Sequence, residues 1–140
     1  MIVAVDPGAA HCGVAVGHGP TVQKPKSCAE VFTLGPREFE DWLDAQLHEG
    51  RFDLVIYEGY RIYPWAKDQQ TWSRVETVEV IGVILWLCRR YGVEVKEQLP
   101  PIKKPTEKVA AQLGWQFKKG DRHARDAELH LAYHLLRLAH

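Results

Sequence analysis

The sequence lacks the features that define several large protein classes. Among its 140 residues are three cysteines, an odd number with no CxxC pair, which argues against a disulfide framework or a structural zinc site and favours a reducing compartment. The longest apolar run, residues 80–88, is far too short to span a bilayer. No basic region precedes the apolar N-terminal run, so we expect neither a signal peptide nor a membrane partner.

An excess of charge is also missing, because 18 basic residues balance 18 acidic ones. Neutrality by itself argues against a simple nucleic-acid binder. The distribution is uneven, however: residues 30–58 hold eight acidic and two basic side chains, whereas residues 96–140 hold nine basic and five acidic ones. Such a polarised molecule can present a basic face to phosphate. A solvated basic surface without a partner explains the same bias.

Several catalytic and nucleotide-binding motifs are absent as well. The sequence has no Walker motif, GxGxxG, nucleophile elbow or HExxH, so no nucleotide cofactor is expected. Its length fits one domain, residues 1–140, which can bury a core without disulfides.

Hydrophobic periodicity and turn residues predict the element order βββαβαβαα. The predicted strands are residues 1–6, 12–17, 31–33, 52–57 and 93–95. The predicted helices are residues 36–49, 71–91, 106–113 (capped by Thr106) and 122–140. This order is typical of one mixed α/β domain, in which helices flank a five-stranded sheet.

Two strongly apolar strands each end in a carboxylate. Residues 2–5 run into Asp6, and Pro7-Gly8 then turns the chain into a second strand; residues 52–57 run into Glu58. Asp6 can simply accept hydrogen bonds from the N–H groups of its own turn. A buried carboxylate is otherwise costly unless it is bound, usually by a divalent metal. Two acids at strand ends favour a shared site, because functional groups gather outside those ends in open α/β sheets.

The last predicted helix adds two more candidate ligands. His123 and Asp126 are three residues apart, hence on one helical face, and the small Ala127 allows close packing on the sheet. Asp121 is a weaker candidate, because it falls on a different face. Hard oxygen ligands suit Mg²⁺ or Mn²⁺, and two such ions about 4 Å apart could activate a water and stabilise the leaving oxygen of a phosphodiester.

Three short motifs together resemble a known family. They are Asp6-Pro7-Gly8 with Gly13, the Glu58 that closes VIYE, and HARDA at residues 123–127. In this order they are similar to the RuvC-type Holliday junction resolvases of the ribonuclease H-like superfamily. The stretch from Glu58 through RIYPW and Trp72 to residues 80–82 more specifically resembles the compact RuvC-like resolvases of actinobacterial bacteriophages. The DPG start is shared with other superfamily members, including sugar kinase-like ATPases.

The resemblance implies a ribonuclease H-like fold and a homodimer that binds four-way DNA junctions and nicks two strands with Mg²⁺ or Mn²⁺, using two ions per subunit. Such an enzyme would work in the bacterial cytoplasm, which is the host's if a phage encodes it. By position, Asp6, Glu58 and Asp126 would be metal ligands. His123 would ligate a metal or position the water, either of which requires a neutral imidazole.

The resemblance and the basic bias also indicate DNA contacts. Three aromatic side chains and one arginine that follow Glu58 could hold an opened junction centre by stacking on its bases: Tyr60, Arg61, Tyr63 and Trp65. The rings could equally cover a dimer contact or a helix. The phosphate-binding candidates flank the inferred site: Lys103, Lys104, Lys118, Lys119, Arg122 and Arg125. The helix at residues 71–91 is apolar on more than one side, so it is either a dimer interface or the central buried helix.

Two other functions stay open from the sequence. One is a ribosomal-RNA-maturation nuclease of the same superfamily, against which the acid after the second core strand and the aromatic stretch argue. The other is a non-catalytic module that binds branched DNA and whose carboxylates are structural. Metal dependence separates them, since a pure binder would hold a junction without Mg²⁺ and leave it intact.

Overall fold

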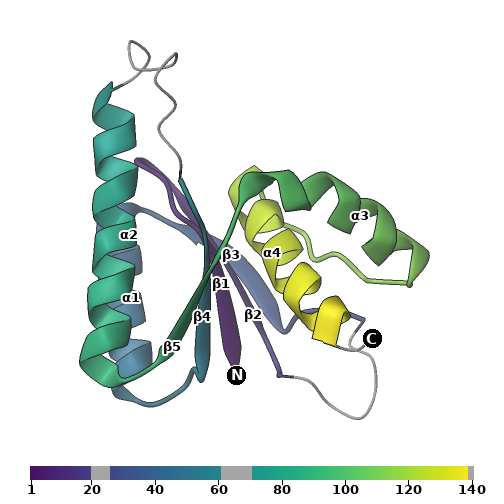
Figure 1. The fold of residues 1–140 in the computed structure, drawn as a ribbon, viewed down its shortest axis with the longest axis horizontal. Helices are drawn as coiled ribbons and strands as arrows, with labels where there is room; N and C mark the ends of the chain where they lie inside the picture. The colour runs from purple at the N-terminus through teal and green to yellow at the C-terminus, as the bar shows by residue number, and fades with distance from the viewer. Residues whose placement is uncertain (20–25, 61–70, 139–140) are drawn as a thin grey trace.

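The computed structural model describes residues 1–19, 26–60 and 71–138, with a five-stranded mixed sheet at its centre (Figure 1). The strand order is β3-β2-β1-β4-β5. The central strand β1 pairs antiparallel with β2 and parallel with β4, while β2–β3 is antiparallel and β4–β5 is parallel. The predicted mixed five-stranded sheet is therefore confirmed. The strands are β1 (Ile2–Asp6), β2 (Cys12–Gly17), β3 (Glu30–Leu34), β4 (Leu54–Glu58) and β5 (Glu94–Gln98).

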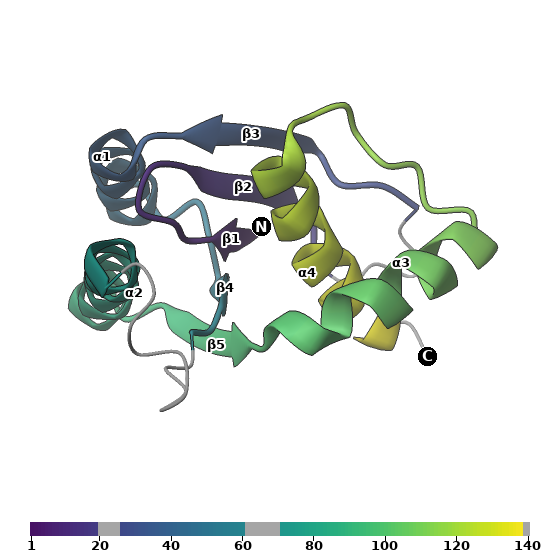
Figure 2. The ribbon, with the colours of Figure 1, turned by 90° about the horizontal axis from the view of Figure 1, so that it is seen from above.

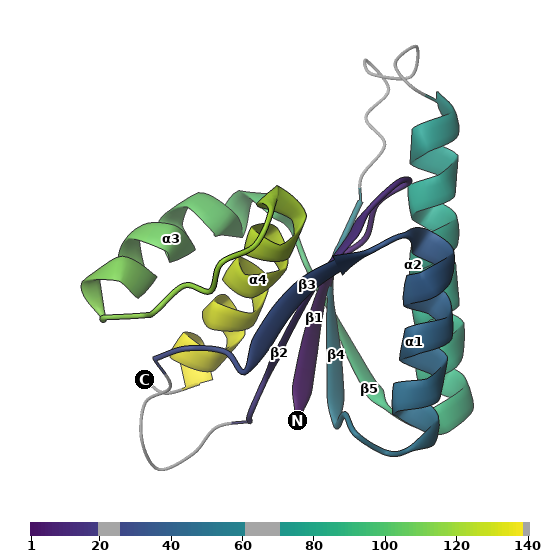
Figure 3. The same cartoon turned by 180° about the vertical axis from the view of Figure 1, so that it is seen from behind.

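Helices cover both faces of the sheet. One face carries α1 (Pro36–His48) and α2 (Thr71–Tyr91), which pack on each other. The other face carries α4 (Arg122–Leu138), which crosses β1 and β2, and α3 (Lys103–Gln112) packs against α4 (Figures 2 and 3). A 3-10 turn, η2 (Pro100–Ile102), leads from β5 into α3. Within the described ranges, none of the helices combines the length and apolar character needed to cross a membrane.

The alternation of side chains along β1 decides which face receives its final carboxylate. Val3 and Val5 are completely buried against the α1–α2 side. Ile2 and Ala4 are buried in the second cluster, on the α4 side. Because strand side chains alternate with a period of two, Asp6 follows Ile2 and Ala4 toward α4.

Strand β4, the parallel neighbour of β1 in the sheet, shows the same alternation. Leu54 and Ile56 pack in the α4-side cluster, whereas Val55 packs on the α1–α2 side. Glu58 therefore points toward α4 as well. Each strand delivers one acid to the same face, at the same edge, because β1 and β4 run parallel.

Helical spacing in the sequence predicts that α2 buries one face, and this prediction is partly wrong; the predicted residues are Val75, Val78, Ile81, Ile84, Leu85 and Cys88. Val75, Val78 and Leu85 are 40–45% exposed. Ile84 and Cys88 are buried as predicted, and Val80 and Leu87 complete the stripe that packs in the core. The helix is apolar around much of its circumference, so periodicity did not distinguish the stripe that meets α1 and the sheet from the one that faces outward.

Thr106 does not cap α3, contrary to the prediction. The helix begins at Lys103, directly after η2, and Ile102 occupies the N-cap position without a side-chain hydrogen bond. Thr106 is buried within the helix. The prolines at 100 and 101 form the 3-10 turn, and Pro105 is tolerated in the first helical turn because its missing N–H would be unpaired there.

Candidate active site

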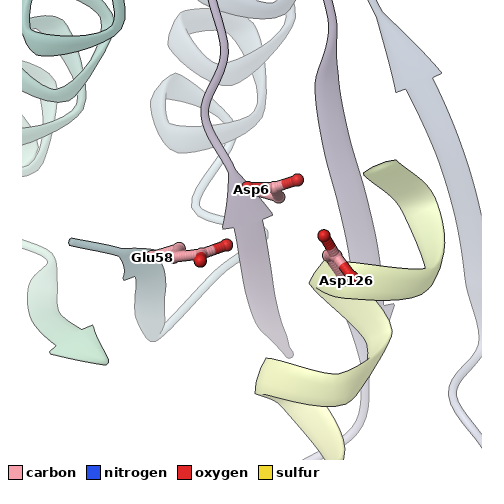
Figure 4. Close-up of side chains that lie close together, drawn as sticks. All are labelled: Asp6, Glu58 and Asp126. Atoms are coloured by element: carbon pink, nitrogen blue, oxygen red, sulfur yellow. The ribbon is translucent and has the colours of Figure 1, made fainter. Parts of the chain in front are cut away.

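Three carboxylates from three separate elements meet at the carboxyl edge of β1 and β4. Asp6 ends β1, Glu58 ends β4, and Asp126 lies near the start of α4. One oxygen from each lies within 4.8 Å of the others, and Figure 4 shows the side chains turned toward one another. Val5 is the register partner of Tyr57, so the next residue of each strand, the acid, reaches the edge at the same level. We call these three residues the acidic triad.

Gly13 allows α4 to approach this edge closely. It is the register partner of Asp6 on β2. A Cβ at this position would lie 1.9 Å from the carbonyl oxygen of His123 and 2.8 Å from the backbone nitrogen of Ala124. The absence of a side chain on Gly13 is therefore what lets the first turn of α4 rest on the sheet and carry Asp126 to Asp6.

His123 lies beside the triad, next to Asp6. Its Nδ1 is 3.6 Å from Asp6 Oδ2, and its side chain is 27% exposed. The ring of His11, from the connection between β1 and β2, lies 5.2 Å from the His123 ring, centroid to centroid. His123 thus occupies the solvent-facing rim of the site.

Lys103 contacts the triad directly. Its Nζ lies 3.1 Å from Glu58 Oε1 and 3.2 Å from Asp126 Oδ2. The sequence indicated Lys103 as one of several phosphate-binding residues flanking the site. The structure places its ammonium between two of the three acids, where it offsets part of their negative charge.

The carboxylates differ sharply in pKa. Burial raises the pKa of Asp6 to about 8, helped by a hydrogen bond to Glu58 and by the negative charges of Glu58 and Asp126. Burial also disfavours the charged form of Glu58, but the close approach of the His130 ring, a hydrogen bond from Asp6 and the charge of Lys103 outweigh it and hold the pKa of Glu58 at about 2. Without a metal, Asp6 is therefore protonated at neutral pH and shares its proton with ionised Glu58.

The triad fits a hard divalent cation. Its donors are carboxylate oxygens, the ligands that Mg²⁺ and Mn²⁺ prefer. Lys103 already places a positive charge between Glu58 and Asp126, which shows that the arrangement favours a cation there. The shared proton of Asp6 and Glu58 indicates the same excess of negative charge.

His130 belongs to the surroundings of the triad but was missed in the sequence. It is fully buried on α4, with its Nε2 3.4 Å from Glu58 Oε2 and its Nδ1 2.8 Å from Gln98 Oε1. A signal was present: His123, Asp126 and His130 follow an i, i+3, i+7 pattern, which is one face of a helix.

Asp121 serves α4 as its N-terminal cap. Its Oδ1 accepts hydrogen bonds from the backbone nitrogen of Ala124 at 2.9 Å and from Thr33 Oγ1 at 2.6 Å. The cap joins α4 to β3, beside the close approach at Gly13. These bonds also lower the pKa of Asp121.

The six predicted phosphate-binding residues lie on α3, on α4 or on the segment between these two helices, which cover the same face of the sheet. Lys104, Lys118, Lys119 and Arg122 are exposed. Arg125 is partly engaged within the protein, because its guanidinium lies 3.8 Å from the centre of the Phe117 ring. Tyr60 is half-buried just after the triad residue Glu58, while Arg61, Tyr63 and Trp65 lie outside the described residues.

The segment that carries Lys118 and Lys119 is anchored to α4 by Glu128. This carboxylate is fully buried and accepts hydrogen bonds from Trp115 Nε1 at 2.9 Å and from the backbone nitrogen of Lys118 at 3.1 Å. The two lysines therefore project from a segment whose backbone is fixed to the helix that holds Asp126.

Solved structures of junction-resolving enzymes share this fold. T. thermophilus RuvC in complex with a Holliday junction substrate superposes with a TM-score of 0.70 at 18% sequence identity, covering 98% of this chain and 94% of the other. Thermus thermophilus RuvC in a second structure gives 0.66 at the same identity and coverage. The Fowlpox virus resolvase in complex with substrate Holliday junction DNA gives 0.58 at 18% identity, covering 95% of this chain and 97% of the other.

The fold is thus the ribonuclease H-like fold of these enzymes, as expected from the sequence. No protein-family model matches the sequence. No curated protein matches it either.

Proposed function

We propose that residues 1–140 form one nuclease domain, a Mg²⁺- or Mn²⁺-dependent endonuclease that resolves four-way DNA junctions. The observation that carries the proposal is the acidic triad of Asp6, Glu58 and Asp126, which gathers at one edge of a fold shared with two junction-bound resolvases. Within this class, the stretch from Glu58 through Trp72 favours the compact bacteriophage type, acting in the bacterial cytoplasm.

In this proposal the triad holds two divalent cations, which would activate water and stabilise the charge on the leaving oxygen of a phosphodiester. Asp6 must give up its proton to serve as a ligand, because its pKa lies near 8 in the metal-free protein. His123, beside Asp6 at the rim, is placed to hold or orient the attacking water through a neutral ring nitrogen. Lys103 places a positive charge within 3.2 Å of two triad carboxylates and would face the scissile phosphate.

Lys118 and Lys119 are expected to bind phosphates on either side of the cut. Replacing both by alanine should weaken binding to junction, fork and duplex alike and reduce the slope of log K against log salt by about 2, roughly one per lysine. Arg51→Gln with Arg89→Ala removes the same charge from the opposite edge and serves as the control. An unchanged slope in the lysine variant, measured by fluorescence anisotropy, would remove these residues from the DNA contact.

The outward face of α2 is the proposed dimer interface. Val75, Val78, Leu85 and Trp86 are each at least 40% exposed on it, an apolar stripe on a described helix that neither α1 nor the sheet covers. Two subunits joined there would cut two strands of one junction.

Leu85→Glu is expected to raise the dimer dissociation constant at least about tenfold while leaving the subunit folded, because substitutions at exposed positions change stability little. Sedimentation velocity across a concentration series measures this. Val109→Glu, equally exposed on α3, is the matched control and should stay dimeric. A wild-type protein that sediments as a monomer throughout would refute the interface.

The substrate class is tested with labelled four-way junction, replication fork, flap and linear duplex DNA and with a structured RNA, each with Mg²⁺. Paired, symmetric nicks near the branch point of the junction are expected. Nicking of forks and flaps at the same rate would make the protein a general branched-DNA nuclease. Cleavage of structured RNA in preference to junctions would favour the RNA-processing alternative.

A further inference from the structure

The feature that the proposed chemistry leaves unexplained is the buried ring of His130. The side chain is completely inaccessible, four residues after Asp126 on α4. Its Nδ1 meets Gln98, but its Nε2 is buried without a hydrogen-bond partner among the residues that the structure describes. The carboxylate oxygen Oε2 of Glu58 lies 3.4 Å from that nitrogen. A buried polar atom is thus aimed at a member of the acidic triad.

Three elements fix this arrangement. Glu58 and Gln98 are register partners on the parallel strands β4 and β5, so their side chains leave the same face of the sheet. The backbone nitrogen of Gly59 also donates to the Gln98 carbonyl at 2.8 Å, which extends the pairing past the acid. Helix α4 lies over this face, and the ring of His130 contacts both the Gln98 and the Glu58 side chain.

The chemistry of the three groups assigns a direction to the contact. An ionised carboxylate only accepts hydrogen bonds, so favourable contact with Glu58 requires that His130 Nε2 carry hydrogen. The Gln98 amide satisfies Nδ1 in either orientation, since it donates through its NH₂ to a neutral ring or accepts through its carbonyl. Because neighbouring α4 residues such as Leu131 and Leu135 fill the core with apolar side chains, packing alone does not require an imidazole at this position.

We infer that His130 is a positioning residue for the acidic triad: held by Gln98, it donates its Nε2–H to Glu58 Oε2 and fixes the rotamer of that carboxylate for metal binding. The second oxygen, Oε1, then stays directed toward Lys103, which also contacts Asp126, and so toward the place where the triad would bind a cation. The inference rests on the proposed function, because it assigns His130 a role toward the metal ligands. Partners of this kind behind metal ligands typically contribute 10- to 100-fold to metal affinity.

The test measures Mn²⁺ binding by isothermal titration calorimetry on the full chain, without DNA, for wild type, His130→Leu and His130→Gln. Leucine fills a similar volume without a donor, whereas the amide NH₂ of glutamine can replace Nε2–H. We expect the Mn²⁺ dissociation constant to rise 10- to 100-fold in His130→Leu and to stay within about threefold of wild type in His130→Gln. Thermal unfolding in EDTA reports stability separately.

A purely structural role would lower the melting temperature of both variants and leave Mn²⁺ affinity unchanged below it, and that result would overturn the inference. If His130→Leu does not fold, Gln98→Leu, at the half-buried end of β5, takes its place. The Mn²⁺ dissociation constant of this variant is again expected to rise, and an unchanged constant would overturn the inference. Because no DNA is present, wild-type Mn²⁺ binding without junction cleavage would refute the proposed function alone. Wild type that binds no Mn²⁺ would overturn both.

Discussion

Replacing Asp6 by asparagine is expected to lower the rate of junction cleavage at least about a thousandfold, while binding of the junction is retained or tightened. Asparagine has nearly the same shape, so the packing at the end of β1 is kept. It removes a negative ligand of the proposed metals, and a thousandfold loss corresponds to about 4 kcal/mol of transition-state stabilisation. Binding is spared because the neutral amide keeps the shape of the side chain and adds no negative charge that would repel phosphate. Single-turnover cleavage and anisotropy in Ca²⁺ measure the two quantities.

Asp53→Asn is the matched control for this change. Asp53 is highly exposed and pairs with the N-terminal amine at the opposite edge of the sheet, so it should cleave at the wild-type rate. Cleavage by Asp6→Asn at the wild-type rate would contradict the metal-site account. Loss of both binding and cleavage would instead indicate a folding defect, which circular dichroism detects.

Asp6→Asn should also change how the unfolding free energy of the metal-free protein depends on pH. The pKa of Asp6 is raised to about 8 from an ordinary value near 3.8, so the folded state holds a proton that the unfolded state releases between these values. This contribution is fully present below pH 4 and is lost as the pH rises to about 8. In EDTA, wild type should therefore lose up to about 4 kcal/mol relative to Asp6→Asn between pH 5 and pH 8, since each pH unit between the two pKa values corresponds to about 1.4 kcal/mol. Parallel stability curves would contradict the raised pKa.

Gly13→Ala is expected to have the second large effect, because it separates α4 from the sheet. The added methyl would lie 1.9 Å from the carbonyl oxygen of His123, a backbone atom that cannot rotate away. Overpacking of this kind typically costs 1–3 kcal/mol, and here the adjustment must move the helix that carries Asp126. We expect a loss of about 3 kcal/mol in unfolding free energy and at least a hundredfold loss of cleavage, since a misplacement near 1 Å has that effect.

Gly19→Ala is the control for this substitution. A Cβ there would meet Ile2 Cδ1 at 3.9 Å, an ordinary van der Waals contact, and its backbone needs no special conformation. It should retain cleavage and change stability little. Wild-type stability and activity in Gly13→Ala, measured by urea unfolding and junction cleavage, would show that the close approach of β2 and α4 is not required.

The convergence of Asp6 and Glu58 could be predicted from the sequence because it depends on local rules. Each acid closes a short apolar strand, and a period of two together with parallel pairing is sufficient to place both at one edge. The spacing of His123 and Asp126 likewise put them on one face of a helix. These inferences required the order of elements and the hydrophobic pattern, both of which the chain displays clearly.

The contacts of Lys103 and His130 could not be derived in the same way. The prolines at 100 and 101 form the 3-10 turn η2, and α3 therefore begins at Lys103, three residues before the expected cap at Thr106. The contact of Lys103 with the triad also depends on how α3 packs against α4, which the sequence alone does not give. The helical spacing of His130 from His123 and Asp126 indicated that it shares their face. Its role, however, depends on Gln98, and the predicted strand ended at residue 95, so Gln98 was not expected to lie in the sheet. For α2, the apolar residues on several sides left the choice of buried stripe to packing with α1.

The most direct test of a metal-dependent junction-cutting centre is cleavage of a labelled four-way junction with Mg²⁺, with Mn²⁺ and with EDTA. We expect paired nicks in both metals, none in EDTA, recovery when excess Mg²⁺ is restored, and none with Asp6→Asn under any condition. Tight junction binding with intact DNA in every metal would contradict this account and make the protein a branched-DNA-binding module.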